Sequence, residues 1–197
     1  GIAFPHMKCN LFDTGIGTML IMRGPGGFSG GQVIDSMTSH LDIFPTLCEL
    51  LEIKQPSWLR GKSLLPLLKE KNEDLHSELF FEVNFHATYE PMRAVRTKRW
   101  KYIKRFDKQH TKPILPNCDD GESKSVLLDH NWKENPLVEE SRFDLVFDPN
   151  ERNNLVNNQN HQTVCNDMRR RLEKWMQETH DPLLKGDLMP PTGAVMN

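Results

Sequence analysis

Arg93-Ala94-Val95-Arg96-Thr97-Lys98-Arg99-Trp100-Lys101-Tyr102-Ile103 is the stretch that decides the fold, because it has the composition of two strands joined by a tight turn. β-branched and aromatic residues stand on either side of Lys98-Arg99, which is typical of a hairpin. We expect strands over residues 92–97 and 100–106, preceded by another over 78–85. Three strands in succession predict an antiparallel meander.

The rest of the second half adds a strand and a helix. Residues 143–147 are a fourth candidate strand, which the turn residues Asp148-Pro149-Asn150 end. Residues 161–180 are the clearest helix, because one side of it is apolar; that side consists of Val164, Met168, Leu172, Trp175 and Met176. Residues 108–140 are polar and without a sustained period, so we expect a long surface excursion there.

The first half has a different pattern. Residues 18–23 are apolar and run into Gly24-Pro25-Gly26-Gly27, which predicts a strand covered on both faces and followed by a flexible loop. Residues 39–53 predict an amphipathic helix that Ser39 or Asp42 caps. A second short helix is expected over 64–68.

Composition excludes several classes of protein. The 197 residues carry a net charge of -2, with 37% hydrophobic and 26% charged residues, which describes an ordinary soluble globular protein with a sizeable core. No excess of basic charge calls for nucleic acid, and no apolar run approaches the roughly 20 residues of a membrane span. The four cysteines lack the spacing of a zinc site, so free thiols are favoured over a metal or redox role; they are Cys9, Cys48, Cys118 and Cys165.

Motifs that would carry chemistry by themselves are missing from the sequence. There is no GxSxG elbow, no HExxH, no GxxxxGK[ST] and no GxGxxG after a strand. Asp119-Asp120-Gly121-Glu122 is too short for a calcium loop and indicates a solvated turn. The chain alone therefore offers no nucleophile.

Five phrases in a fixed order carry a family resemblance. They are Gly1 to Lys8 with the apolar segment after it, His40 to Leu47, Leu59 to Pro66, Arg93 to Ile103, and Asp144 to Leu155. In this order the chain resembles the downstream half of a sulfatase. Pro91-Met92-Arg93 and Glu178 to Pro182 look most like the N-sulfoglucosamine sulfohydrolase (heparan N-sulfatase) branch and its bacterial relatives.

The resemblance implies an α/β fold in which the end of an alkaline-phosphatase-like sheet is followed by a C-terminal subdomain. In that subdomain a four-stranded antiparallel sheet packs on a terminal helix. We expect the catalytic domain to end within residues 1–72, the subdomain to cover 73–182, and a loose tail to follow over 183–197. Sulfatases use Ca²⁺ and a formylglycine, and we expect both in the complete parent. We expect none of the metal ligands in this chain, because Gly1 resembles the glycine that ends the metal-binding motif of the family.

Lys8 is the residue that the resemblance places in catalysis, as a contact to the sulfate in the complete enzyme; the alternative is a solvated surface lysine. His6 is a weaker candidate beside it. The candidates for substrate binding at the rim of a saccharide cleft are His86, Tyr89 and Glu90. The alternative is that His86 is an ordinary turn histidine and that Tyr89 only packs. A basic hairpin would attract a glycosaminoglycan, or simply protect a strand edge; it contains Lys98, Arg99, Lys101, Lys104 and Arg105.

The sequence thus predicts the C-terminal portion of a sulfatase whose parent hydrolyses sulfate esters or N-sulfates of a saccharide, while the isolated chain is inactive. One alternative is a non-catalytic module for carbohydrate binding or assembly. A weaker one is a fragment of a phosphonate or phosphodiester hydrolase. The expected partners are a sulfated saccharide, bound by the complete enzyme, the missing N-terminal half, and a second copy of the chain. A secreted, a periplasmic and a cytoplasmic parent all stay open.

Overall fold

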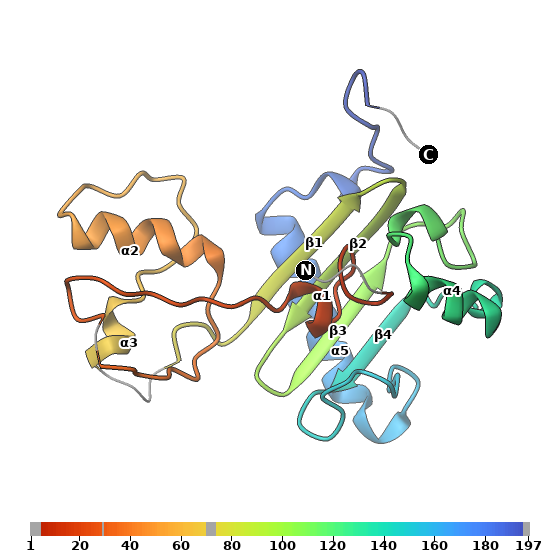
Figure 1. Ribbon diagram of the computed structural model, residues 1–197, viewed down its shortest axis with the longest axis horizontal. Coiled ribbons are helices and arrows are strands. Elements are labelled where there is room, and N and C mark those ends of the chain that lie inside the picture. Colours follow the sequence, from red (N-terminus) through yellow and green to blue (C-terminus); the bar gives the residue numbers. More distant parts are fainter. Residues whose placement is uncertain (1–4, 29, 70–73, 195–197) are drawn as a thin grey trace. The chain divides into compact units, whose positions relative to one another are not determined.

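The computed structural model describes residues 5–28, 30–69 and 74–194, and Figure 1 shows their arrangement. They form two compact units, one made by Met19–Leu79 and the other by residues 5–18 together with 80–194. This other unit is the larger one, and it combines residues from before and after the smaller unit. The expected domain boundaries at 72 and 182 concern a longer protein and stay predictions.

The larger unit is built on a four-stranded sheet in the order β1-β2-β3-β4 (Figure 1). The strands are β1 (Leu79–Phe85), β2 (Tyr89–Arg96), β3 (Trp100–Arg105) and β4 (Glu140–Asp144). β3 pairs antiparallel with β2 on one side and with β4 on the other. The meander is confirmed, although β4 begins and ends three residues earlier than its pattern predicts.

Helix α5 (Gln162–Glu178) covers one face of this sheet (Figure 1). Val95 and Tyr102, which face each other across β2 and β3, pack against its buried residues Cys165, Met168, Leu172 and Met176. Each fully buried side chain of this size contributes roughly 1.5–3 kcal/mol. The apolar stripe of the sequence thus predicted both the helix and the face that it buries. Helix α5 begins directly after the short helix η4 (Gln159–His161).

The N-terminal segment, residues 5–18, covers the opposite face. Leu11 is buried among Met92, Ala94, Ile103 and Phe143, and α1 (Asp13–Ile16) follows it. Buried charges fasten the segment: the Lys101 ammonium lies 2.8 Å from Glu151 Oε1 and also pairs with Asp13. The Arg96 guanidinium forms a further ion pair with Asp13 at 3.0 Å. Since such a cluster is costly to leave half-paired, it fixes the path of the segment across the sheet.

The smaller unit is organised around the carboxylate of Asp42. After the short helix η1 (His40–Asp42), α2 runs over Ile43–Leu50, and α3 covers Leu65–Lys69. Asp42 is buried and accepts hydrogen bonds from the amides of Ser39 at 2.7 Å and Lys62 at 2.8 Å. A Cβ on Gly61 would lie 2.0 Å from the carbonyl oxygen of Leu41, so only glycine allows this close approach. Asp42 therefore links two stretches of chain, which goes beyond the helix cap predicted for it.

The strand expected over 18–23 was wrong: these residues form no regular element. Met19 and Ile21 are each 85% exposed and Val33 is 92% exposed. A strand requires a hydrogen-bonded neighbour, and within the described residues none lies beside this stretch. Part of the apolar stripe of α2 is exposed as well, since Phe44 is 46% and Leu47 43% exposed, whereas Cys48 is buried.

The surface excursion contains more structure than its composition predicts. It includes η2 (Leu115–Asn117), α4 (Glu122–Asp129) and η3 (Trp132–Glu134). Beyond α5, η5 (Pro182–Leu184) follows, and the amide of Leu188 donates to Tyr89 Oη at 3.0 Å. The first part of the tail therefore contacts β2 through this hydrogen bond, and the loose tail over 183–197 stays a prediction. Among the described residues, no helix has both the length and the apolar character that crossing a bilayer requires.

Candidate functional site

The Lys8 ammonium forms an ion pair with the carboxylate of Asp119, which lies 111 residues further along the chain. The two side chains are 35% and 38% exposed. The hydrogen bond that Lys8 donates to Asp119 raises the pKa of Lys8, and the same bond lowers the pKa of Asp119. Lys8 is thus a partly exposed cation with a carboxylate partner, and both the sulfate contact and the solvated surface lysine stay predictions.

The acidic loop that carries Asp119 is attached to the β1–β2 turn by Asn117. The buried side chain of Asn117 accepts hydrogen bonds from the amides of Ala87 at 3.0 Å and Thr88 at 2.8 Å. Its Nδ2 donates to Glu90 Oε2 at 2.7 Å. This side chain therefore brings the turn after β1 next to the loop that holds Lys8.

His86 lies in that turn and is exposed. Its charge contributes to the low pKa of Asp119, after the larger effect of Lys8. His86 therefore lies within electrostatic reach of the Lys8–Asp119 pair. The ring of His6 has a pKa lowered by burial, and it packs edge-on against Phe12 and Trp132, which indicates a packing role.

Glu90 belongs to the same neighbourhood, and Tyr89 does not. The carboxylate of Glu90 pairs with Arg105, accepts from Asn117, and helps to raise the pKa of Cys9, which follows Lys8. Tyr89 packs against Phe85 with ring centroids 4.9 Å apart. Because neighbouring residues of a strand face opposite sides of the sheet, Tyr89 and Glu90 do not line one surface.

Most of the basic hairpin is already paired with carboxylates. Lys101 is bound to Glu151, Arg105 to Glu90, and Arg99 lies 2.8 Å from Asp144. The Lys104 ammonium lies 5.4 Å from the centroid of the Phe106 ring. These pairs reduce the attraction that the five basic residues would exert on a polyanion.

The described residues do not fit a calcium site of their own. Across residues 5–28, 30–69 and 74–194, no group of three or more His, Cys, Asp or Glu side chains is placed to hold a metal ion. None of the cysteines stands in a C/S-x-P/A-x-R motif either. We therefore derive no step through a metal or a formylglycine.

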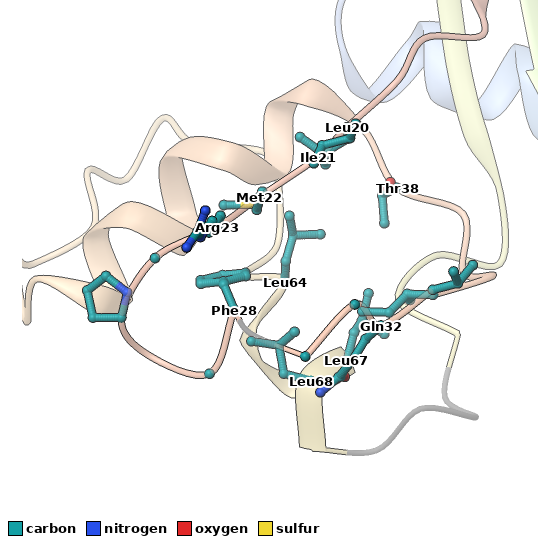
Figure 2. A pocket seen from close by; sticks show the side chains of 17 residues that line it. Leu20, Ile21, Met22, Arg23, Phe28, Gln32, Thr38, Leu64, Leu67 and Leu68 are labelled. Atoms are coloured by element: carbon teal, nitrogen blue, oxygen red, sulfur yellow. The ribbon is translucent and has the colours of Figure 1, made fainter.

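A hollow of about 940 Å³ lies within the smaller unit (Figure 2). Figure 2 shows Ile21, Met22 and Phe28 around the same space as side chains from the α3 region, Leu64, Leu67 and Leu68. Arg23, Gln32 and Thr38 are the polar side chains among its lining residues. A lining this apolar favours contact with further polypeptide over contact with a sulfated sugar.

The ion pair predicts a change in titration. Replacing Lys8 by methionine removes the main cause of the low pKa of Asp119, so we expect that pKa to rise toward the ordinary value of about 3.9. Because the folded-state pKa is depressed, the pair stabilises the fold above the unfolded value and loses this effect as the pH falls through the folded value. Carboxyl NMR measures the shift. Lys112→Met, which breaks the Lys112–Glu134 pair, should leave Asp119 unchanged; an unchanged Asp119 in Lys8→Met would contradict the pairing.

Comparison with known proteins identifies the family of the chain. The family described as N-sulphoglucosamine sulphohydrolase, C-terminal, matches residues 6–136. An ulvan-active sulfatase of Formosa agariphila is 28% identical in an alignment that covers 89% of this chain and 31% of that protein. The human N-sulphoglucosamine sulphohydrolase is 27% identical in an alignment that covers 92% of this chain and 41% of that protein.

A putative sulfatase from Bacteroides thetaiotaomicron has the same fold in its crystal structure, with a TM-score of 0.53 and 23% identity over 76% of this chain and 27% of that one. The architecture is that of the C-terminal region of a sulfatase with an alkaline-phosphatase-like fold. Within that class, the chain belongs to the family of N-sulphoglucosamine sulphohydrolase C-terminal regions. It spans between 31% and 41% of the length of the two sulfatases named above.

Proposed function

We propose that this chain completes a sulfatase that hydrolyses sulfate esters or N-sulfates of a saccharide, and that Lys8 contacts the sulfate. The observation that carries the proposal is the Lys8–Asp119 pair on a segment fastened across the sheet. A fixed cation stabilises the charge that develops on the transferred sulfate and on the leaving atom. Lys8 supplies such a cation from a position that the buried charge cluster maintains.

Asp119 serves as the counter-ion of Lys8 until a sulfate replaces it. Because both side chains are more than one-third exposed, their pair is weak, and an anion can displace the carboxylate at small cost. The displaced Asp119 stays beside the sulfate through its loop. In an N-sulfate the leaving atom is a nitrogen, and a carboxylate nearby favours the ammonium form of the released amine.

His86 is the proposed saccharide contact on this side of the sheet, because it is exposed and close to Asp119. Glu90 supports it through Asn117, since both of its oxygens are engaged by Asn117 and Arg105. Tyr89 reaches the opposite face and holds the amide of Leu188. Its contribution to saccharide binding would therefore be indirect, through the tail.

The rest of the enzyme would supply what these residues lack. Sulfatases generally use Ca²⁺ and a formylglycine, and we propose that residues outside this chain provide both. The exposed apolar side chains of the smaller unit support such a completion, because Met19, Ile21 and Val33 would be buried by further polypeptide. The exposed stripe of α2 supports it for the same reason.

We expect the purified 197-residue chain to turn over neither an aryl sulfate nor N-sulfoglucosamine, because no nucleophile is assigned within it. A spectrophotometric assay with the complete enzyme as positive control measures this, and turnover by the isolated chain would contradict the proposal. Parallel assays of the complete enzyme with an aryl sulfate and an aryl phosphonate separate a sulfatase from a phosphonate hydrolase. An inactive complete protein that binds a sulfated saccharide would instead indicate a binding module.

A further inference from the structure

The ammonium of Lys124 is bound by oxygens of the loop that carries Asp119. It donates to the carbonyl of Leu115 at 3.0 Å, to the carbonyl of Cys118 at 2.8 Å and to Asp120 Oδ1 at 2.8 Å. An ammonium has three N–H donors and no acceptor, so these bonds use all of its donors. Lys124 is therefore fully engaged with one loop and does not act as a free cation.

The place of Lys124 in its helix is unfavourable for a lysine. It is the third residue of α4, in the first turn, where the helix dipole disfavours a positive charge. It is also buried, which lysine side chains rarely are unless their charge is paired. The oxygens of the loop offset both of these costs. The contacts of the ammonium with the loop therefore account for a lysine at this position.

These contacts hold the chain on both sides of Asp119. Cys118 precedes Asp119 and Asp120 follows it, and both are bound to the same ammonium. One residue before Cys118, the side chain of Asn117 accepts a hydrogen bond from the amide of Thr88 at 2.8 Å. The backbone around Asp119 is thus held by two buried side chains, those of Asn117 and Lys124.

We propose that Lys124 is a positioning residue, which holds the carboxylate of Asp119 against Lys8. Its meaning for catalysis rests on the proposed function. A carboxylate that is held in place loses little freedom when it pairs with Lys8, so it competes with a sulfate more strongly than a carboxylate on a loose loop. Lys124 would therefore set the affinity of Lys8 for an anion without contacting the anion itself.

A direct effect of the Lys124 charge on Asp119 is the alternative. The charge of Lys124 contributes to the low pKa of Asp119, after the hydrogen bond from Lys8, the charge of Lys8 and the charge of His86. A direct effect depends on the distance between the two charges, so it would persist without Lys8. A positioning effect acts through the contact between Asp119 and Lys8, so it would disappear without Lys8.

The test uses the full 197-residue chain and measures the pKa of Asp119 by carboxyl NMR. Lys124→Met removes the charge and the donors, so that pKa should rise in the same direction as in Lys8→Met, and by no more. Lys124→Arg keeps the charge and several donors and should restore most of the low pKa. In the Lys8→Met background, adding Lys124→Met should change the pKa of Asp119 little.

Lys62→Met is the matched control, because the Lys62 ammonium also donates to a carbonyl, that of Leu75 at 3.0 Å in the smaller unit. It should leave the pKa of Asp119 unchanged. Circular dichroism checks the fold, and Lys124→Gln, which keeps an amide donor without the charge, replaces Lys124→Met if that variant does not fold. An unchanged pKa of Asp119, or the same rise with and without Lys8, overturns the proposal.

Kinetics of the complete enzyme separate this proposal from the proposed function. If Lys8 contacts the sulfate, Lys124→Met should lower KM for an aryl sulfate by about two- to fivefold, in line with the small contribution of exposed ion pairs. The change in kcat should be small, because Asp119 leaves Lys8 before the sulfate reacts. A raised pKa of Asp119 with an unchanged KM would confirm Lys124 as the positioning residue and remove the ion pair from the sulfate site.

Discussion

Replacing Lys8 by alanine in the complete enzyme lowers kcat for an aryl sulfate by about 10²–10³-fold, the range found when one preorganised group that stabilises developing charge is removed. Folding changes little, because the Lys8–Asp119 pair is partly exposed and exposed ion pairs contribute little to stability. Steady-state kinetics and thermal unfolding of the same preparations separate the two effects. The loss should be larger in kcat than in KM, since the charge on the sulfate develops in the transition state.

Two further variants control for charge and geometry. Lys8→Arg keeps the charge but presents it on a planar fork, so it should retain more activity than Lys8→Ala. Lys112→Ala removes a lysine from another exposed ion pair, Lys112–Glu134, and should leave kcat unchanged. Wild-type activity of Lys8→Ala would remove Lys8 from the site while leaving the family assignment intact.

Replacing Arg93 by methionine lowers the free energy of unfolding by about 3–5 kcal/mol, because it leaves a buried carboxylate unpaired. Arg93 is fully buried in β2, and its Nε donates to Asp181 Oδ2 at 2.6 Å. Its Nη1 donates to Asn84 Oδ1 at 2.8 Å. The guanidinium thus connects β1, β2 and the chain after α5. Urea unfolding followed by circular dichroism measures the loss.

A double-mutant cycle tests whether the loss belongs to the Arg93–Asp181 pair. Adding Asp181→Asn to Arg93→Met removes the unpaired charge, so the double variant should be less unstable than the sum of the two single variants. Lys174→Ala, which affects the exposed Lys174–Glu178 pair on α5, should change stability by less than about 1 kcal/mol. Strictly additive losses would show that the two residues act separately.

Local pattern was enough to predict the sheet and the terminal helix. The hairpin has its turn at Lys98-Arg99, and the stripe on α5 includes Met168 and Leu172, so neighbours in sequence carry the information. The prediction of a strand over 18–23 was wrong because a strand also depends on a neighbouring strand with which it can form hydrogen bonds. The apolar side chains of residues 18–23 can be read from the sequence, but the strand with which they would pair cannot.

The candidate site was only partly predictable for a similar reason. Lys8, His86 and Glu90 follow from the family resemblance and from local residue types, and Asn117 connects the turn after His86 to Glu90. Asp119 was interpreted as part of a solvated turn, since nothing near it in the sequence indicates a partner 111 residues away. Tyr89 could have been separated from Glu90 by the alternation of side chains along a strand.

The fastening of residues 5–18 by Lys101 and Glu151 has a consequence for biosynthesis. The segment with Lys8 leaves the ribosome before the groups that hold it, Lys101 and Glu151, which emerge roughly 100 and 150 residues later. At about 5–20 residues per second, several seconds pass before they are available. A nascent chain that stops before Glu151 would carry Lys8 without its anchor. The segment with Lys8 can therefore be fastened only after Glu151 has been synthesised, and a product truncated before Glu151 would lack a properly held lysine.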